Sequence, residues 1–183
     1  MQKTTHILLL TTALLAGAAH AADSVMVGGQ AMLPSKDIID NAVNSGDHKT
    51  LVAAVKAAGL VDTLKGKGPF TVFAPTDAAF AKLPDGAVNN LLKPENKGAL
   101  SKVLTYHVVP GKYDFKSLSE AIWSGQGKAT LGTASGGKLM FAMNGSHNIQ
   151  VWDEAGGMAN ISVYDVNQSN GVINVVDTVL MPK

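Results

Sequence analysis

The chain has 183 residues, of which 46% are hydrophobic and 16% charged, with a formal net charge of +1 and no cysteine. Its 15 basic residues are all lysines and are nearly matched by 14 acidic residues. This balance argues against nucleic-acid binding, which needs a basic face and usually arginine forks. The apolar content argues against a disordered chain, and the lack of cysteine excludes a disulfide or a lipid-anchored cysteine.

The first 21 residues have the pattern of a cleaved signal peptide. A basic start precedes an apolar run from Ile7 to Ala16, and the segment ends in the A-x-A cleavage pattern Ala19-His20-Ala21. The apolar run is shorter than the ~20 residues that a membrane-spanning helix needs. We therefore predict an exported protein, periplasmic or secreted and not membrane-spanning, that begins at Ala22. A retained N-terminal anchor is the alternative.

The 162 residues that follow are predicted to form one domain, because no repeat, charge block or linker divides them. Residues 22–36 are predicted to be an N-terminal extension and residues 37–183 the domain itself. Apolar spacing predicts a first helix over 37–43, capped by Ser35, and a second over 51–58 that Gly59 ends.

The stretch GPFTVFAPTDAAFAKLP, residues 68–84, combines a predicted strand with a predicted helix. Phe70 to Ala74 is rich in strand-forming residues, and Pro75 forces the residue before it out of helical geometry. Thr76 or Asp77 then offers a side-chain oxygen to the free amides of the helix start, where a carboxylate also meets the positive end of the helix dipole. Since no histidine or second carboxylate lies nearby in sequence, we interpret both residues as structural.

The second half of the chain changes from helical to strand patterns. Pro94 opens a helix, and a short helical turn is predicted over 118–122. Glycine and asparagine then separate predicted strands over 138–143, 148–152, 159–164 and 171–180, and Gly132–Gly137 is predicted to be a hairpin loop rather than a phosphate cradle. Helices followed by a run of strands are typical of an α+β fold.

Asn174 and Asp177 lie in the most apolar of these predicted strands, residues 171–180. Apolar side chains alternate onto both of its faces, so both faces require burial and the strand is expected at the centre of a sheet. Asn174 and Asp177 must then be hydrogen-bonded, because an unpaired buried polar group costs ~1 to 3 kcal/mol.

Three segments of the chain together resemble the fasciclin-like (FAS1) domain. They are GPFTVFAPTDAAFAKLP, then LTYHVVPGKY over 104–113, and SNGVINVVDTVLMPK over 169–183. The resemblance extends from about residue 37 to the end and implies a FAS1 fold, a wedge-like β-sandwich with several helices packed on it. It also implies adhesion or matrix binding without catalytic activity. The family usually has histidine where this chain has Asn174, which bears on any role that needs an imidazole there.

Tyr106 and His107 are the pair most often discussed as an interaction site in this family. As a strand pair they face opposite sides of a sheet, so they cannot both line one small pocket without a bulge. In one interpretation Tyr106 fills the core with its hydroxyl bonded and His107 is a satisfied structural histidine. In the other, these residues and Asn174 contact a partner, which the resemblance makes a cell-surface or matrix protein or a glycan.

A hydrophobic small molecule is the alternative partner. Soft methionines and aromatic residues gather in the strand half and can line an adaptable apolar groove; they are Met140, Phe141, Met143, Trp152, Met158 and Met181. Some FAS1 proteins bind hydrophobic pigments, so the resemblance also allows an exported carrier of a lipid-like or carotenoid-like molecule. Strand alternation places Met140 and Phe141 on opposite faces, which favours ordinary core packing for most of the set.

Catalytic, metal and cofactor chemistry has little support in the sequence. The histidines beyond the signal segment lack the i, i+3 or i, i+4 spacing of metal ligands. No G-x-S-x-G, H-E-x-x-H or glycine-rich phosphate loop occurs. We therefore predict no enzyme activity, no cofactor and no metal. The glycosylation sequons at Asn144, Asn160 and Asn167 are expected to be unmodified polar turns.

Overall fold

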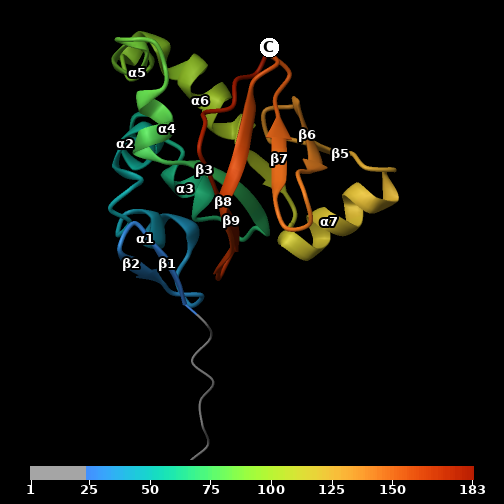
Figure 1. The fold of residues 1–183 in the computed structure, drawn as a ribbon. Coiled ribbons are helices and arrows are strands. Elements are labelled where there is room, and N and C mark those ends of the chain that lie inside the picture. The colour runs from blue at the N-terminus through green and yellow to red at the C-terminus, as the bar shows by residue number, and fades with distance from the viewer. Residues whose placement is uncertain (1–23) are drawn as a thin grey trace, which may run out of the picture.

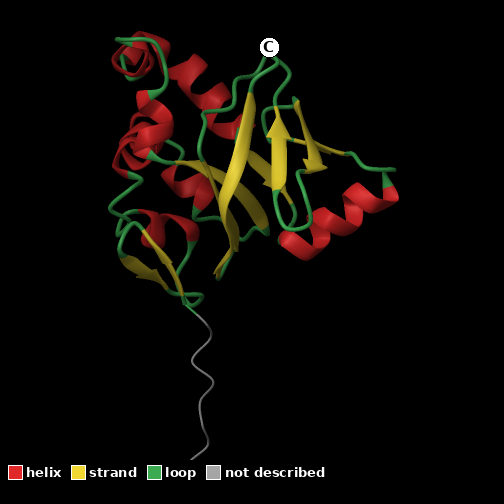
Figure 2. Ribbon diagram, in the orientation of Figure 1, coloured by secondary structure: helices red, strands yellow, loops and turns green. Residues whose placement is uncertain are grey.

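The structure is a computed structural model, and it describes residues 24–183; the predicted signal peptide lies outside them. The helices are α1 (Ile38–Ala42), α2 (Lys49–Ala58), α3 (Val61–Leu64), α4 (Asp77–Ala81), α5 (Ala87–Leu91), the 3-10 helix η1 (Pro94–Asn96), α6 (Lys97–Tyr106) and α7 (Phe115–Ser124). The strands are β1 (Val25–Val27), β2 (Gln30–Met32), β3 (Phe70–Pro75), β4 (Val108–Pro110), β5 (Ala129–Gly132), β6 (Lys138–Met143), β7 (Ile149–Trp152), β8 (Met158–Gln168) and β9 (Gly171–Val176). Figure 1 shows α1 to α6 gathered on one side of strands β3 to β9 and α7 on the other, and Figure 2 shows the β1–β2 hairpin beside the helices, apart from the other strands. The predicted α+β class is confirmed.

Seven strands form one mixed sheet in the order β4-β3-β9-β8-β7-β6-β5. The β3–β9 pair is parallel and the other pairs are antiparallel. The long strand β8 joins two halves of the sheet, because its first residues pair with β7 and its later residues with β9. Register shifts between Ile161 and Val163 and between Val163 and Val166 bend it there.

The sheet separates two hydrophobic cores. Phe73 of β3 packs with Leu118 of α7 in the core beside β5 to β7, whereas its neighbour Val72 packs with the helices of the other side. All six residues of β9 are buried, and β9 has β3 and β8 as neighbours. The prediction of a central strand with two buried faces is thus confirmed, and the alternation of apolar residues is its cause.

Several predicted boundaries hold and others shift. Helix α2 ends at Gly59 in left-handed geometry (φ 72°), as predicted. The cap of α1 is Asp37 rather than Ser35, since the Asp37 side chain accepts the N–H of Asp40. The last strand ends at Val176, short of the predicted residue 180, because the Asp177 carboxylate turns to bind the N–H of Asn160 at 2.8 Å.

The structure also locates the predicted N-terminal extension and the predicted hairpin loop. The residues predicted as an N-terminal extension include the β1–β2 hairpin, whose Val27 and Met32 are buried in the helical core. Gly132–Gly137 forms the predicted hairpin loop between β5 and β6, where the N–H of Thr133 donates to the carbonyl of Gly137 at 2.8 Å.

Candidate functional site

Thr76 and Asp77 cap two different helices. The Thr76 hydroxyl accepts the N–H of Ala79 at 3.2 Å, at the start of α4. The Asp77 carboxylate instead accepts the N–H of Thr50 at 2.8 Å, at the start of α2, where the N-cap residue His48 makes no side-chain cap. Asp77 therefore joins the starts of two packed helices, and it satisfies a donor that α2 itself leaves free.

The hydrogen bonds of Asp77 favour its charged form. Burial raises the pKa of Asp77, but hydrogen bonds from Thr50 and Lys49 and the charge of His48 outweigh burial and hold the pKa below its ordinary value. The stabilisation is therefore present above the ordinary carboxyl pKa and is lost as the pH falls through the lowered value.

Asp77→Ala is expected to lower the free energy of unfolding by ~0.5 to 2 kcal/mol, the range for a lost helix cap. Asp77→Asn keeps an acceptor oxygen and is expected to cost less. Urea denaturation at neutral and acid pH measures both, and the loss on acidification that is due to Asp77 should disappear in the two variants. An Asp77→Asn protein that folds as the parent but no longer attaches to its partner would make Asp77 a binding residue.

Tyr106 and His107 do not form a strand pair. Tyr106 is the last residue of α6, His107 is its C-cap, and the strand begins only at Val108. The prediction of strand geometry for these two residues is wrong. The helix continues through them because Leu100, Val103 and Leu104 are buried along one face of α6, and that packing overrides the local strand preference of the segment.

Tyr106 is fully buried, and its hydroxyl joins the ends of two strands. The hydroxyl donates to the carbonyl of Lys138 at 2.7 Å and accepts the N–H of Glu154 at 2.9 Å. Gly137 lies against the ring, since a Cβ there would come within 2.6 Å of a ring carbon. Burial raises the pKa of Tyr106, and the negative charges of Glu154 and Asp153 raise it further. The hydrogen bond from the Glu154 backbone N–H lowers the pKa of Tyr106, but burial outweighs it.

His107 holds the C-terminal segment against the end of α6. Its Nδ1 lies 2.8 Å from the carbonyl of Val103, and its Nε2 accepts the N–H of Leu180 at 2.9 Å. These bonds assign the proton of the neutral ring to Nδ1. Only 2% of His107 is exposed, and this burial lowers its pKa to about 4. The hydrogen bond to Val103 and the charge of Asp153 raise the pKa of His107, but by less than burial lowers it.

Asp153 completes this attachment, and our reading of the sequence missed it. One carboxylate oxygen accepts the N–H of Met181 at 2.8 Å, and the other accepts the N–H of Gly157 at 2.6 Å. We refer to His107 and Asp153, which bond Leu180 and Met181, together as the C-terminal lock. An aspartate directly before the Glu-Ala-Gly-Gly turn is a signal for the bond to Gly157, but nothing in the spacing indicates Met181.

Asn174 is placed elsewhere in the fold. It is fully buried on β9, where its amide oxygen accepts the N–H of Asp165 at 3.2 Å and its amide nitrogen donates to the carbonyl of Tyr113 at 3.1 Å. Asp165 lies in the irregular part of β8 with a φ of 58°. No hydrogen bond joins the Asn174 side chain to Tyr106 or His107 within residues 24–183.

Asp177 ties the end of β9 to β8. Its two carboxylate oxygens accept the backbone N–H and the side-chain amide of Asn160 at 2.8 and 3.0 Å, and Lys82 lies 3.8 Å away. Burial raises the pKa of Asp177, but the bonds from Asn160 and Thr178 and the charge of Lys82 lower it below its ordinary value. Asn160 is also one of the three sequons, and these bonds use its amide within the fold.

The candidate residues therefore lie in the interior. Tyr106, His107 and Asn174 have almost no exposed surface and use their polar atoms on backbone groups of the same chain. In this conformation none of the three presents a free group to a macromolecular partner. The arrangement is that of buried side chains that hold backbone segments of the same chain together.

Ser45 and His48 form a second buried pair that our sequence reading missed. The Ser45 hydroxyl lies 2.8 Å from Nδ1 of His48, while Nε2 of His48 has no hydrogen-bond partner among residues 24–183. The pair borders an internal volume of about 50 Å³ that is otherwise lined almost entirely by apolar side chains. A volume of this size is far smaller than the ~300 to 1,000 Å³ of a ligand pocket, so the pair has no room for a substrate beside it.

Neither of two pockets formed by residues 24–183 has the size of a carrier's pocket. Pockets for drug-sized molecules usually enclose about 300 to 1,000 Å³, whereas the internal volume is about 50 Å³ and a groove bordered by Met140 and Trp152 is about 230 Å³. Strand alternation divides the methionine and aromatic set as expected, but the prediction that most of the set is ordinary core is wrong. Phe141 is fully buried, Met143, Trp152 and Met181 are half-buried, and Met140 and Met158 are exposed. Within residues 24–183, no three metal-ligating side chains converge, and no helix has the length and apolar character needed to cross a membrane.

Comparison with known proteins agrees with this architecture. The Fasciclin domain family matches residues 46–182. The chain is 43% identical to protein sll1483 of Synechocystis, over 87% of this chain and 81% of that protein. It is 32% identical to the cell surface glycolipoprotein MPB83 of Mycobacterium bovis, over 85% of this chain and 64% of that protein. The chain belongs to the Fasciclin domain family.

A solved structure has the same fold. It is a FAS1 domain pair from the insect cell adhesion molecule Fasciclin I, which this chain matches with a TM-score of 0.72 at 19% identity. The match covers 81% of this chain and 52% of that one, in keeping with one domain against a pair. The α+β FAS1 fold that the three sequence segments implied is confirmed.

Proposed function

We propose that this protein is a non-enzymatic, exported binding module that attaches to a component of a cell surface or extracellular matrix. The observation that carries the proposal is the Fasciclin domain itself, which accounts for nearly all of the described chain. One relative is named a cell surface glycolipoprotein and the matched structure comes from a cell adhesion molecule. The buried polar residues support the module's shape, and the contact lies on its outer surface.

Attachment of the host cells tests the proposal. We expect deletion of the gene to reduce attachment to matrix or to other cells, and we expect the full gene to restore it. Purified protein, added in solution, should compete with the cells for the same surface. Unchanged attachment in the deletion strain, together with no binding of purified protein to cells or matrix, would contradict the proposal.

Export depends on the Ala19-His20-Ala21 pattern. We expect the protein from the periplasm or the medium to begin at Ala22, because signal peptidase cleaves after the second small residue of such a pattern. N-terminal sequencing and the intact mass measure this directly. A mature protein that still contains Met1 or the apolar run would contradict the proposed localisation.

A carrier function is the weaker candidate, since the internal volume and the groove beside Trp152 are both smaller than a pocket for a lipid-like or carotenoid-like molecule. Native mass spectrometry of protein purified from its own host separates the two functions. We expect the mass of the polypeptide alone, and a bound hydrophobic molecule would favour the carrier.

A further inference from the structure

A row of soft and aromatic side chains crosses one face of strands β6, β7 and β8. The register pairs Met140 with Trp152 and Trp152 with Met158, so the three side chains stand next to one another on the same face. Met140 and Met158 are 43% and 41% exposed, and Trp152 lies half-buried between them. We refer to these three residues as the Met–Trp row.

Within residues 24–183, no helix covers this row. Helix α7 packs on the opposite face of the same strands, where its Leu118 and Ile122 share a core with Leu139 and Phe141. Figure 1 shows α7 beside β5 and β6, and α1 to α5 gathered at the left of the view, away from β6 and β7. The Met–Trp row is consequently the solvent side of a rigid sheet, which suits a binding platform.

Hydrogen-bonding side chains border one side of the row. Gln150 and Asn160 are register partners on β7 and β8, and the Gln150 amide donates to the Asn160 amide oxygen at 3.1 Å. By strand alternation both side chains share the face of Trp152. The face is thus apolar in the middle and amide-bearing along one margin.

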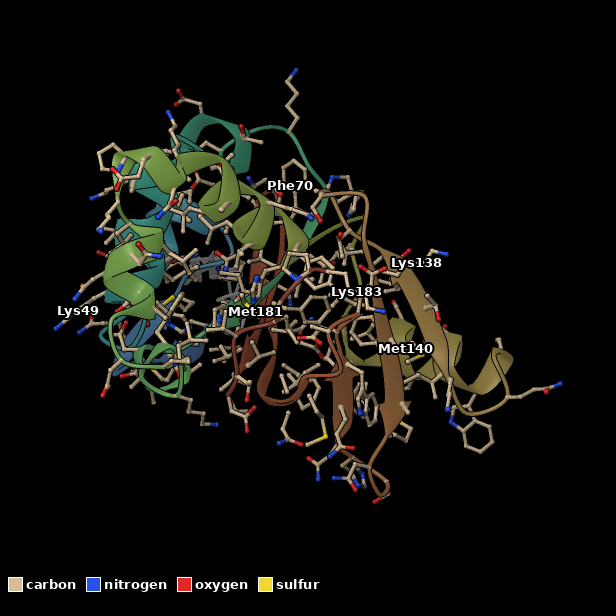
Figure 3. The ribbon with its side chains drawn as sticks, turned by 90° about the horizontal axis from the view of Figure 1, so that it is seen from above. Lys49, Phe70, Lys138, Met140, Met181 and Lys183 are labelled. Atoms are coloured by element: carbon tan, nitrogen blue, oxygen red, sulfur yellow. The ribbon has the colours of Figure 1, made fainter. Side chains whose placement is uncertain are left out.

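Two lysines supply charge on the same face. Lys128 lines the groove of about 230 Å³ together with Met140 and Trp152. Lys138 is exposed and shares the face of Met140 by alternation along β6. Figure 3 shows Lys138 and Met140 on the strand side of the molecule, away from Lys49 on the helical side. Within residues 24–183 neither Lys128 nor Lys138 has a carboxylate within 4.0 Å.

An acidic polysaccharide has the chemistry that this face recognises. A sugar ring has an apolar C–H face for an indole, hydroxyl groups for amides and, in an acidic sugar, a carboxylate for unpaired lysines. We infer that the Met–Trp row and its bordering Gln150, Asn160, Lys128 and Lys138 bind an acidic polysaccharide. This inference rests on the proposed function and names its partner class. The centre of a protein interface is usually depleted of lysine, which favours a polysaccharide over a protein partner.

Fluorescence of Trp152 reports the contact directly. The chain has two tryptophans, so Trp123→Phe leaves Trp152 as the sole indole emitter. Titration of this variant with polygalacturonate should shift the emission to saturation, and neutral dextran should not. The apparent affinity should fall as NaCl is raised from about 0.01 to 0.15 M, because salt screens the lysine charges.

Matched variants separate this face from the rest of the surface. By calorimetry we expect Trp152→Ala to raise the Kd for polygalacturonate about tenfold or more, as for an aromatic residue at the centre of an interface. Lys128→Gln with Lys138→Gln should also raise the Kd and reduce its salt dependence. Trp123→Ala, which removes a side chain on a residue that is 79% exposed on α7, and Lys116→Gln on the same helix should leave the Kd unchanged.

The melting temperature of each variant shows whether it folds. If Trp152→Ala does not fold, the Kd of the double lysine variant tests the inference. The inference is overturned if polygalacturonate does not bind, including the case in which phosphatidylglycerol vesicles bind instead. It is also overturned if the Trp152→Ala and double lysine variants bind polygalacturonate as tightly as the parent does. If the parent mediates attachment but folded Trp152→Ala attaches equally well, the inference fails and the proposed function stands. If the parent mediates no attachment, the proposed function fails whatever the polysaccharide result.

Discussion

Tyr106→Ala is expected to lower the free energy of unfolding by ~3 to 5 kcal/mol, the range for deleting a large buried aromatic side chain. The ring is fully buried in the core beside α7, and its hydroxyl bonds both the Lys138 carbonyl and the Glu154 N–H. The substitution therefore leaves a cavity and two backbone groups without their partner. Chemical denaturation at pH 7, monitored by circular dichroism, measures the loss.

Tyr106→Phe separates the two contributions. It keeps the ring and removes the hydroxyl, so we expect a loss of ~1 to 3 kcal/mol for the backbone groups left unsatisfied. Attachment to a partner should fall in both variants only as the folded fraction falls. A Tyr106→Phe protein that retains the stability of the parent but loses attachment would show instead that the hydroxyl contacts the partner.

Acid is expected to weaken the C-terminal lock through His107. The neutral ring accepts the N–H of Leu180 on Nε2, and protonation of Nε2 removes that acceptor. Burial lowers the pKa of His107 from 6.5 to about 4. Because the unfolded chain binds the proton more readily, the contribution of His107 to stability is fully present above the unfolded pKa of 6.5 and is lost as the pH falls to about 4. At about 1.4 kcal/mol per pKa unit, that loss is roughly 3 kcal/mol.

His107→Gln provides the control, because it retains an acceptor but does not titrate. The parent should be more stable than the variant at pH 7, and its advantage should shrink by roughly 3 kcal/mol as the pH falls from 6.5 to about 4. The comparison also removes the contribution of His48, whose pKa burial lowers as well, and of Asp153, which remains in both proteins. Urea denaturation across this pH range gives both curves, and parallel curves would contradict the prediction.

Hydrogen exchange shows whether the loss is local. The Leu180 amide, which bonds His107, should lose protection near pH 4 before Ile173 in the centre of β9 does. A shared loss at both amides would mean that acid unfolds the whole domain rather than releasing the C-terminal segment.

Local pattern alone was enough for the elements with strong periodicity. The apolar stripe of α2 and its terminal Gly59, the doubly apolar β9 and the loop between β5 and β6 follow from residue spacing and turn chemistry. Such features depend on neighbours in the chain, so no distant contact was needed to predict them. The three segments that resemble FAS1 likewise carried the fold class before any tertiary contact was known.

Hydrogen bonds between residues far apart in sequence could be identified only from the tertiary structure. Asp77 caps α2 by accepting the N–H of Thr50, 27 residues earlier, and His107 binds a backbone amide 73 residues later. Tyr106 belongs to a helix although its neighbours prefer a strand, because the buried face of α6 extends the helix to that point. The Met–Trp row likewise depends on strand register. Spacing along the chain determines on which face of a helix or strand a side chain lies. The packing of distant segments determines which residues that side chain contacts.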